Sequence, residues 1–209
     1  MLLMIGNAFG IQPKTRGQSI NQSTSEQLLD DYYHISVYQS LLKKACTLAE
    51  RVTHAAIMPY PNLAFGSSEW ELKKRLGKPN LKLSPENALS EQLYLYRRLI
   101  AGYKVRFEFH FYQGALFYAK RVFRHTSREE NDLIIENVRK KYLDDTEFNH
   151  RQAKIVDHQG NELIINTGVY LSLDYLNMQG PAFAQLRAWI EAGQQPDAAP
   201  LPDPSDPSE

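Results

Sequence analysis

Three ionisable side chains alternate along one short segment of the sequence: Arg106, Glu108 and His110. At every second position of a strand they would share one face, where such a trio holds an anion or takes part in general acid–base catalysis. The same pattern is typical of a solvated sheet face whose charges pair with one another. We favour the solvated face and treat the trio as a candidate surface for a ligand or partner.

A second group, just before that segment, mixes aromatic and basic side chains: Tyr94, Tyr96, Arg97 and Arg98. Tyrosine and arginine are enriched at protein contacts, and mixtures of aromatic and basic side chains also bind nucleic acids. A third interpretation is that the tyrosines are half-buried strand residues with a purely structural role. Lys+Arg and Asp+Glu number 24 each, so the zero net charge argues against a nucleic-acid partner. We therefore expect a protein partner, and the candidate face comprises Tyr94, Tyr96, Arg98, Arg106, Glu108 and His110.

The sequence offers little support for other chemistry. There is no Gly-rich phosphate loop, no Gly-x-Ser-x-Gly elbow and no His-Glu-x-x-His motif. Carboxylates and imidazoles gather before a late hairpin, but their spacing matches no metal motif. We expect no metal, no cofactor and no catalytic residue, and lean toward a protein that is not an enzyme. The residues of that acidic and histidine group are Asp144, Asp145, His150, Asp157 and His158.

Compartment signals point to the cytoplasm. Cys46 is the single cysteine, so no internal disulfide forms, and we expect it to face the packing of its helix. The apolar start, Met1 to Ile5, has no basic residue before it and breaks at Gly6, which argues against a signal peptide. No stretch approaches the ~20 apolar residues that span a bilayer, so we expect no membrane association.

The first element that must position these groups is a helix predicted over residues 24–57. Ser23 and Glu26 have capping-box spacing, and Pro59 ends the helix. At ~1.5 Å per residue it would reach roughly 50 Å, which is long for a chain of 209 residues. We expect either a break or a projecting end that binds a partner, with a homodimer through 24–57 as one form of that contact.

Three strands are predicted next, over 91–100, 103–112 and 115–123, joined by short turns into an antiparallel meander. The alternation within 103–112 predicts that the odd positions point inward and that the other side is wet. The odd positions are Tyr103, Val105, Phe107, Phe109 and Phe111. Shorter helices are expected over 68–76, 127–143 and 181–192. A hairpin over 153–157 and 162–165 and a strand over 168–176 complete the elements.

The predicted fold class is α+β: an antiparallel sheet, made of the three-stranded meander and the later hairpin and strand, packed against a long N-terminal helix and two to three shorter helices. Residues 1–23 are interpreted as a flexible arm and 24–192 as a single α+β domain. Residues 193–209 hold five prolines, four acidic residues and no Lys or Arg, so we expect a disordered acidic tail.

One segment resembles a known repeat unit. Gly66-Ser67-Ser68, Lys73 and Leu76-Gly77-Lys78-Pro79, followed by an aromatic meander ending in Gln113-Gly114-Ala115-Leu116, resemble the repeat of BamE-like and beta-lactamase-inhibitor-like bacterial proteins. The resemblance covers residues 64–124. It implies a small helix followed by antiparallel strands whose face binds other proteins. The chain lacks the lipid-modified cysteine of BamE, so outer-membrane assembly is not implied.

Together these patterns favour a non-enzymatic interaction protein, with an adaptor, accessory or chaperone-like role, that binds a partner through its sheet face and the 24–57 helix. The alternative hypothesis is an enzyme or small-ligand-binding protein with a pocket between sheet and helices. That alternative relies on Arg106, His110 and Tyr94 converging on one pocket.

Overall fold

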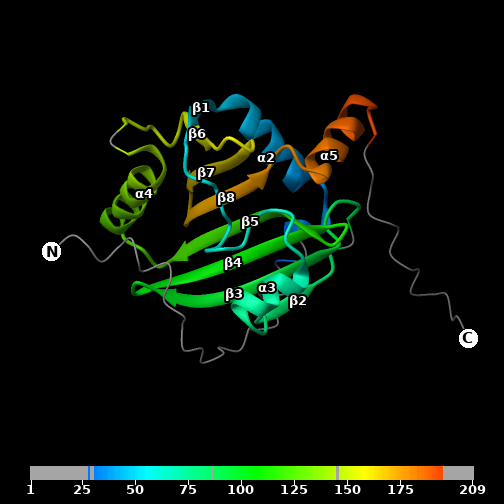
Figure 1. Cartoon of the computed structure of the whole chain (residues 1–209), viewed down its shortest axis with the longest axis horizontal. Coiled ribbons are helices and arrows are strands. Elements are labelled where there is room, and N and C mark those ends of the chain that lie inside the picture. The colour runs from blue at the N-terminus through cyan, green and yellow to red at the C-terminus, as the bar shows by residue number, and fades with distance from the viewer. Residues whose placement is uncertain (1–27, 29–30, 86, 145, 195–209) are drawn as a thin grey trace, which may run out of the picture.

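A computed structural model describes residues 28, 31–85, 87–144 and 146–194 of the chain. Its centre is one eight-stranded sheet with the order β1-β6-β7-β8-β5-β4-β3-β2, and helices lie on both sides of it (Figure 1). The elements, in chain order, are α2 (Ser36–Thr47), β1 (Ala49–Val52), α3 (Glu69–Leu76), β2 (Leu81–Leu83), β3 (Gln92–Ile100), β4 (Tyr103–Tyr112), β5 (Ala115–Arg124), α4 (Arg128–Leu143), β6 (Ala153–Val156), β7 (Asn161–Thr167), β8 (Leu171–Asn177) and α5 (Pro181–Glu191).

The meander β3-β4-β5 is closed by two tight turns. Each turn has two central residues, Ala101-Gly102 in the first and Gln113-Gly114 in the second, and all four have positive φ. Positive φ at both positions is what a type I′ turn requires, and that turn matches the right-handed twist of the strands it joins. The turns therefore fix which residues of β3, β4 and β5 lie opposite one another.

The same arrangement of elements occurs twice. α3 precedes the strands β3-β4-β5, and α4 precedes β6-β7-β8. The last strand of each unit, β5 and β8, pair antiparallel at the centre of the sheet. Both helices begin at a capping box, formed by Ser68 with Glu71 and by Ser127 with Glu130, which satisfies free backbone N–H groups at the helix start.

One side of the sheet, here called the phenylalanine face, is defined on β4 by Val105, Phe107, Phe109 and Phe111. Their exposed fractions are 2%, 1%, 0% and 0%, so the inward alternation predicted from sequence is confirmed. The helices α3 and α4 cover this face, with Leu72 of α3 among the side chains of its core. Burial of such rings stabilises the sheet by ~25 cal/mol per Å² of apolar surface removed from water.

The opposite side, the polar face, is defined on β4 by Lys104, Arg106, Glu108 and His110. The helices α2 and α5 contact each other and pack against this side through a second apolar core that includes Tyr38 and Phe183. Both Glu108 and His110 are 0% exposed. The expectation of a wet side was therefore wrong at Glu108 and His110, which α2 and the segment before it cover, and holds at the start of β4, where Lys104 is exposed and Arg106 is half-buried.

The expectation of a long helix over 24–57 was also wrong. Leu48 has extended backbone after α2, and residues 49–52 form β1 instead. Thr47 caps the end by donating from its hydroxyl to the carbonyl of Lys44 at 2.8 Å. Pairing of β1 with β6 supplies backbone hydrogen bonds that outweigh the intrinsic helix preference of Ala49, Glu50 and Arg51. The proposed dimer through 24–57 therefore loses the element on which it rested.

The expectation of a purely antiparallel sheet was also wrong, because β1 runs parallel to β6.

The expectation for Cys46 was wrong as well, because this cysteine is exposed rather than buried in helix packing. The predicted arm 1–23, and the tail from residue 195 onward, lie outside the described residues. Within the described part of the chain, no helix has the length and apolar character needed to cross a membrane.

Candidate functional site

The six predicted site residues do not form one surface. In the register of β3 with β4, Tyr94 lies opposite Phe109 and Tyr96 opposite Phe107. Residues directly opposite one another share a face, so Tyr94, Tyr96 and Arg98 belong to the phenylalanine face. Arg106, Glu108 and His110 lie on the polar face. The sheet itself separates the two halves of the predicted site.

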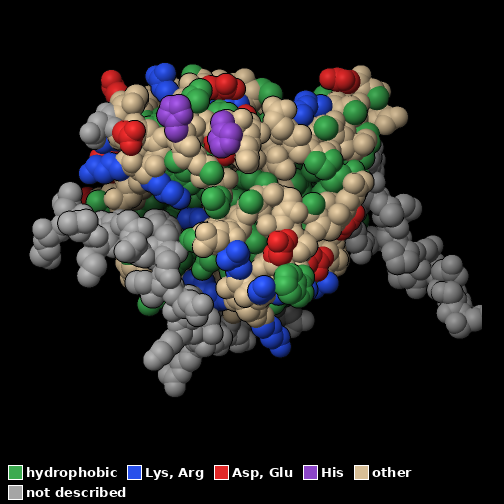
Figure 2. All heavy atoms as spheres, in the orientation of Figure 1, with side chains coloured by type: hydrophobic (Ala, Val, Ile, Leu, Met, Phe, Trp, Pro, Cys, Tyr) green, Lys and Arg blue, Asp and Glu red, His purple; other side chains and the backbone are tan. Residues whose placement is uncertain are grey.

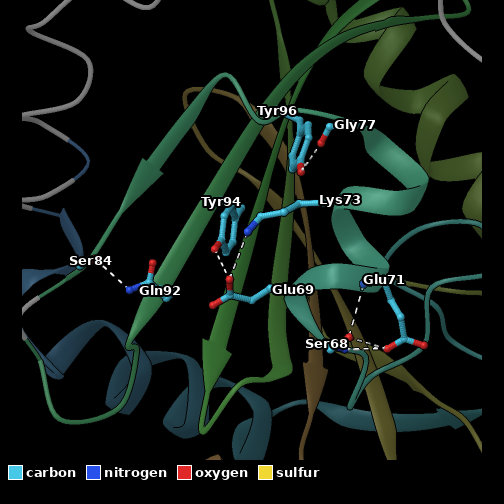
Figure 3. Close-up of polar contacts among 9 residues, drawn as sticks. All are labelled: Ser68, Glu69, Glu71, Lys73, Gly77, Ser84, Gln92, Tyr94 and Tyr96. Atoms are coloured by element: carbon cyan, nitrogen blue, oxygen red, sulfur yellow. Dashed lines mark hydrogen bonds and ion pairs between the residues drawn. The ribbon is translucent and has the colours of Figure 1, made fainter.

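The first half is organised by α3, as Figure 3 shows. The Tyr94 hydroxyl donates to the Glu69 carboxylate, and the Lys73 ammonium pairs with the same carboxylate at 3.3 Å. Burial opposes ionisation of Glu69, but the hydrogen bonds from Tyr94 and Lys73 outweigh it and lower the pKa of that carboxyl. These contacts attach the first turn of α3 to β3.

The C-terminal end of α3 is attached to the same strand. The Tyr96 hydroxyl donates to the Gly77 carbonyl at 3.1 Å, and the Arg98 guanidinium donates to the Leu76 carbonyl at 2.7 Å. Carbonyls at a helix end lack partners within the helix. Tyr96 and Arg98 therefore stabilise the end of α3, and all three predicted residues on this face are accounted for by positioning this helix.

The outer side of α3 carries Trp70, which is 66% exposed. The Lys74 ammonium lies 4.8 Å from the centre of the indole ring. In Figure 2 an exposed apolar side chain stands among basic and acidic ones over the region of α3. The helix beneath is fixed at both ends, so the indole is presented from a rigid support.

The second half of the predicted site belongs to a buried polar cluster beneath α2 and the segment before it. Glu108 receives a hydrogen bond from the Tyr32 hydroxyl at 2.5 Å and pairs with the Arg106 Nε at 2.6 Å. Hydrogen bonds to charged groups are about twice as strong as neutral ones. The cluster consists of Tyr32, Tyr38, Glu108, His110, Tyr118 and Asp174.

His110 lies between aromatic rings. The Tyr38 hydroxyl is 2.9 Å from its Nδ1, and the rings of Tyr32 and Tyr118 have centroids 4.5 and 4.7 Å from the imidazole. Its Nε2 has no hydrogen-bond partner among the described residues. Burial, together with the positive charge of Lys120, holds the pKa of His110 well below its usual range, so the imidazole is neutral.

Asp174 of β8 completes the cluster. It accepts a hydrogen bond from the Tyr118 hydroxyl at 2.7 Å and another from the Asn166 amide, whose oxygen in turn accepts from the Lys44 ammonium. Burial raises the pKa of Asp174, against the opposing effects of Lys120 and the Tyr118 hydrogen bond. A chain of polar contacts thus runs from the cluster to exposed Lys44 on α2.

Acid–base work by this cluster on a substrate is not supported. The exposed fractions of its six side chains are at most 3%, so the imidazole and the carboxylates do not face solvent. A candidate acid or base must lie within hydrogen-bond reach of the proton it moves. The cluster instead satisfies polar groups beneath α2 and fixes how this helix lies on the sheet.

No group of described residues is suited to hold a metal ion. Asp157, one of the candidates before the late hairpin, is fully used in a turn. Its carboxylate accepts hydrogen bonds from the backbone N–H of Ile57 at 2.9 Å, of Gln159 at 2.9 Å and of Asn161 at 3.0 Å. Its role is to close the turn and attach the segment at Ile57 to it.

Sequence reasoning missed four members of the cluster: Tyr32, Tyr38, Tyr118 and Asp174. One signal was present, since Asp174 and Ser172 alternate with Leu171, Leu173 and Tyr175 in the same way that Glu108 alternates with phenylalanines. The pairing of β5 with β8 that brings Asp174 beside Lys120 has no local signal, because the two strands are separated by α4 and two further strands.

A scan against protein-family models, a search of curated proteins and a search of solved structures each found no match to this chain.

Proposed function

We propose that this chain is a non-enzymatic interaction protein whose contact surface is the outer side of α3, centred on Trp70. The observation that supports this most strongly is an indole 66% exposed on a helix whose two ends are both attached to β3. Large aromatic side chains are costly to leave in water, and tryptophan dominates the energetics of many protein contacts. A rigid support lowers the entropy lost on binding.

The charges around Trp70 indicate the chemistry of the partner. Lys73, Lys74 and Arg75 follow the indole on the same helix, and the turn after it adds Lys78. Lys74 already lies on the ring face. An acidic protein surface with an apolar pocket complements this arrangement, because opposite potentials steer encounter while the buried ring provides affinity.

The resemblance to BamE-like and beta-lactamase-inhibitor-like repeats also supports a binding role, with one change of place. In those proteins the sheet face binds the partner, whereas here both faces of the central strands are covered by helices. The helix that matches the Leu-Gly-Lys-Pro segment of the resemblance is α3 itself. We therefore place the contact on that helix rather than on the sheet.

Site-specific photocrosslinking in the native cell extract tests this proposal. A benzophenone amino acid replaces Lys74, which lies beside the indole, in one full-length variant and Leu133, 48% exposed on α4, in a matched control. We expect an adduct of defined mass from position 74 only, and its loss when Trp70→Ala is added. Adducts from both positions, none from position 74, or an adduct indifferent to Trp70→Ala would each contradict the proposed surface.

A further inference from the structure

Basic side chains gather on the polar face at one end of β3, β4 and β5. Arg97 of β3 lies directly opposite Arg106 of β4, and Lys104 of β4 lies directly opposite Arg124 of β5. Glu108 pairs with Arg106. Among the described residues, no carboxylate forms an ion pair with Arg97, Lys104 or Arg124. These four residues, Arg97, Lys104, Arg106 and Arg124, are called the strand-end cations.

This placement is unfavourable for the isolated fold. Like charges directly opposite one another destabilise a sheet, and the strand-end cations contain two such pairs. Burial and the positive charges of Arg124 and Arg106 lower the pKa of Arg97. The Nε atoms of Arg97 and Arg124 are buried and have no hydrogen-bond acceptor in the described part of the chain. Donors held in place without acceptors indicate a site for an anion.

We propose that the strand-end cations bind a compact anion carrying two or more phosphoryl groups. Guanidinium groups present planar forks that match phosphate oxygens in pairs. Neighbouring strands are about 4.8 Å apart and successive same-face residues about 7 Å apart, so the cations span the length of a small polyphosphate. The ring of Tyr170, 5.6 Å from the Arg124 guanidinium carbon, holds that arginine at the edge of the site.

A long polyanion fits less well, because the positive charge does not continue across the sheet. In the row that holds Arg97 and Arg106, the next residues are Val122 on β5, Ser172 on β8 and Asn166 on β7. These side chains are neutral, so a nucleic-acid backbone would find cations over only three strands. This proposal is independent of the partner surface on α3, which belongs to the other side of the sheet.

Titration calorimetry of the full-length protein with inorganic triphosphate tests the proposal. We expect saturable binding of one anion per chain that weakens as NaCl is raised. The variants Arg97→Gln and Arg124→Gln should each weaken binding at least tenfold, while Arg75→Gln, an exposed arginine of α3, should not change it. Absence of binding, or equal binding by all variants, would overturn the proposal.

Melting temperatures without ligand and binding of a single-stranded oligonucleotide provide two further tests of the anion site. Without ligand, the melting temperatures of Arg97→Gln and Arg124→Gln should equal or exceed that of the unmodified chain, because each removes repulsion. A lower melting temperature would mean that the arginines stabilise the fold instead, and contradicts the proposal. A single-stranded oligonucleotide that binds more tightly than triphosphate through the same arginines would also overturn it, in favour of a polymeric ligand.

Discussion

On the phenylalanine face of β4, Phe107, Phe109 and Phe111 pack against α3, α4 and the neighbouring strands, whereas on the polar face Glu108 and His110 are equally buried but lie among tyrosines. One side is held by contacts that have no required direction. The other also has an apolar core, and to it are added hydrogen bonds that require particular partners at particular distances.

This contrast explains which parts of the fold tolerate substitution. An apolar core tolerates substitutions that keep its volume and its hydrophobic pattern. A buried polar group that loses its hydrogen-bond partner lowers the stability of the fold by the full free energy of its desolvation. The buried polar cluster therefore specifies how Tyr32, Tyr38 and α2 lie on the sheet, while the apolar cores on the two faces supply packing that stabilises the sheet without fixing one arrangement. The predictions that follow separate these two roles.

The largest effect is expected on the phenylalanine face. Phe109→Ala should lower the free energy of unfolding by about 3–5 kcal/mol, because it leaves a cavity beside Tyr96 and Phe107, which the ring of Phe109 contacts. Urea unfolding followed by circular dichroism measures this change. Phe109→Leu should cost about 1 kcal/mol, since most of the volume is kept. Equal losses in the two variants would show that packing volume does not determine stability here.

The next effect is expected on the polar face. Glu108→Ala removes the acceptor of the Tyr32 hydroxyl and the partner of Arg106. We expect a loss of about 2–3 kcal/mol, below the usual value for a buried ion pair because the Arg106 side chain is 20% exposed. Glu108→Gln retains an acceptor for Tyr32 and should lose less. If Glu108→Ala were as stable as the unmodified chain, the cluster would have no role in the fold.

A pH titration of stability isolates His110. Because the pKa of His110 is lowered in the folded chain, the unfolded chain binds a proton first as the pH falls below about 6.5. The free energy of unfolding should then fall on acidification, by up to about 1.4 kcal/mol per pH unit. His110→Gln should reduce that slope, leaving the part due to His150, whose pKa is also lowered by burial. Asp174, whose raised pKa has the opposite sign, is common to both proteins, so the difference between their curves reports His110 alone.

The sequence predicted local features well because their causes are local. The alternation in 103–112, the capping box of Ser68 with Glu71 and the glycine turns at 102 and 114 are all present. Each depends on residues a few positions apart, whose preferences act before any tertiary contact forms. The meander β3-β4-β5 follows from them.

The errors have non-local causes. Residues 49–52 have a sequence compatible with helix, but they pair with β6, about a hundred residues later. Glu108 and His110 look like exposed strand residues until Tyr32 and Tyr38 are placed over them. The six candidate site residues are divided between two covered faces for the same reason, because alternation shows which residues share a face of one strand but not what covers that face.

The smallest effect is expected at the proposed partner surface. Trp70→Ala should change the free energy of unfolding by less than about 0.5 kcal/mol, because the indole is 66% exposed and the ring contact it makes with Lys74 is at the surface. The same urea experiment measures it, with Leu72→Ala as the matched change on the buried side of α3, where Leu72 is 0% exposed and about 2–5 kcal/mol should be lost. A large loss in Trp70→Ala would mean that the indole serves the fold, and the argument that it is kept exposed for a partner would then fail.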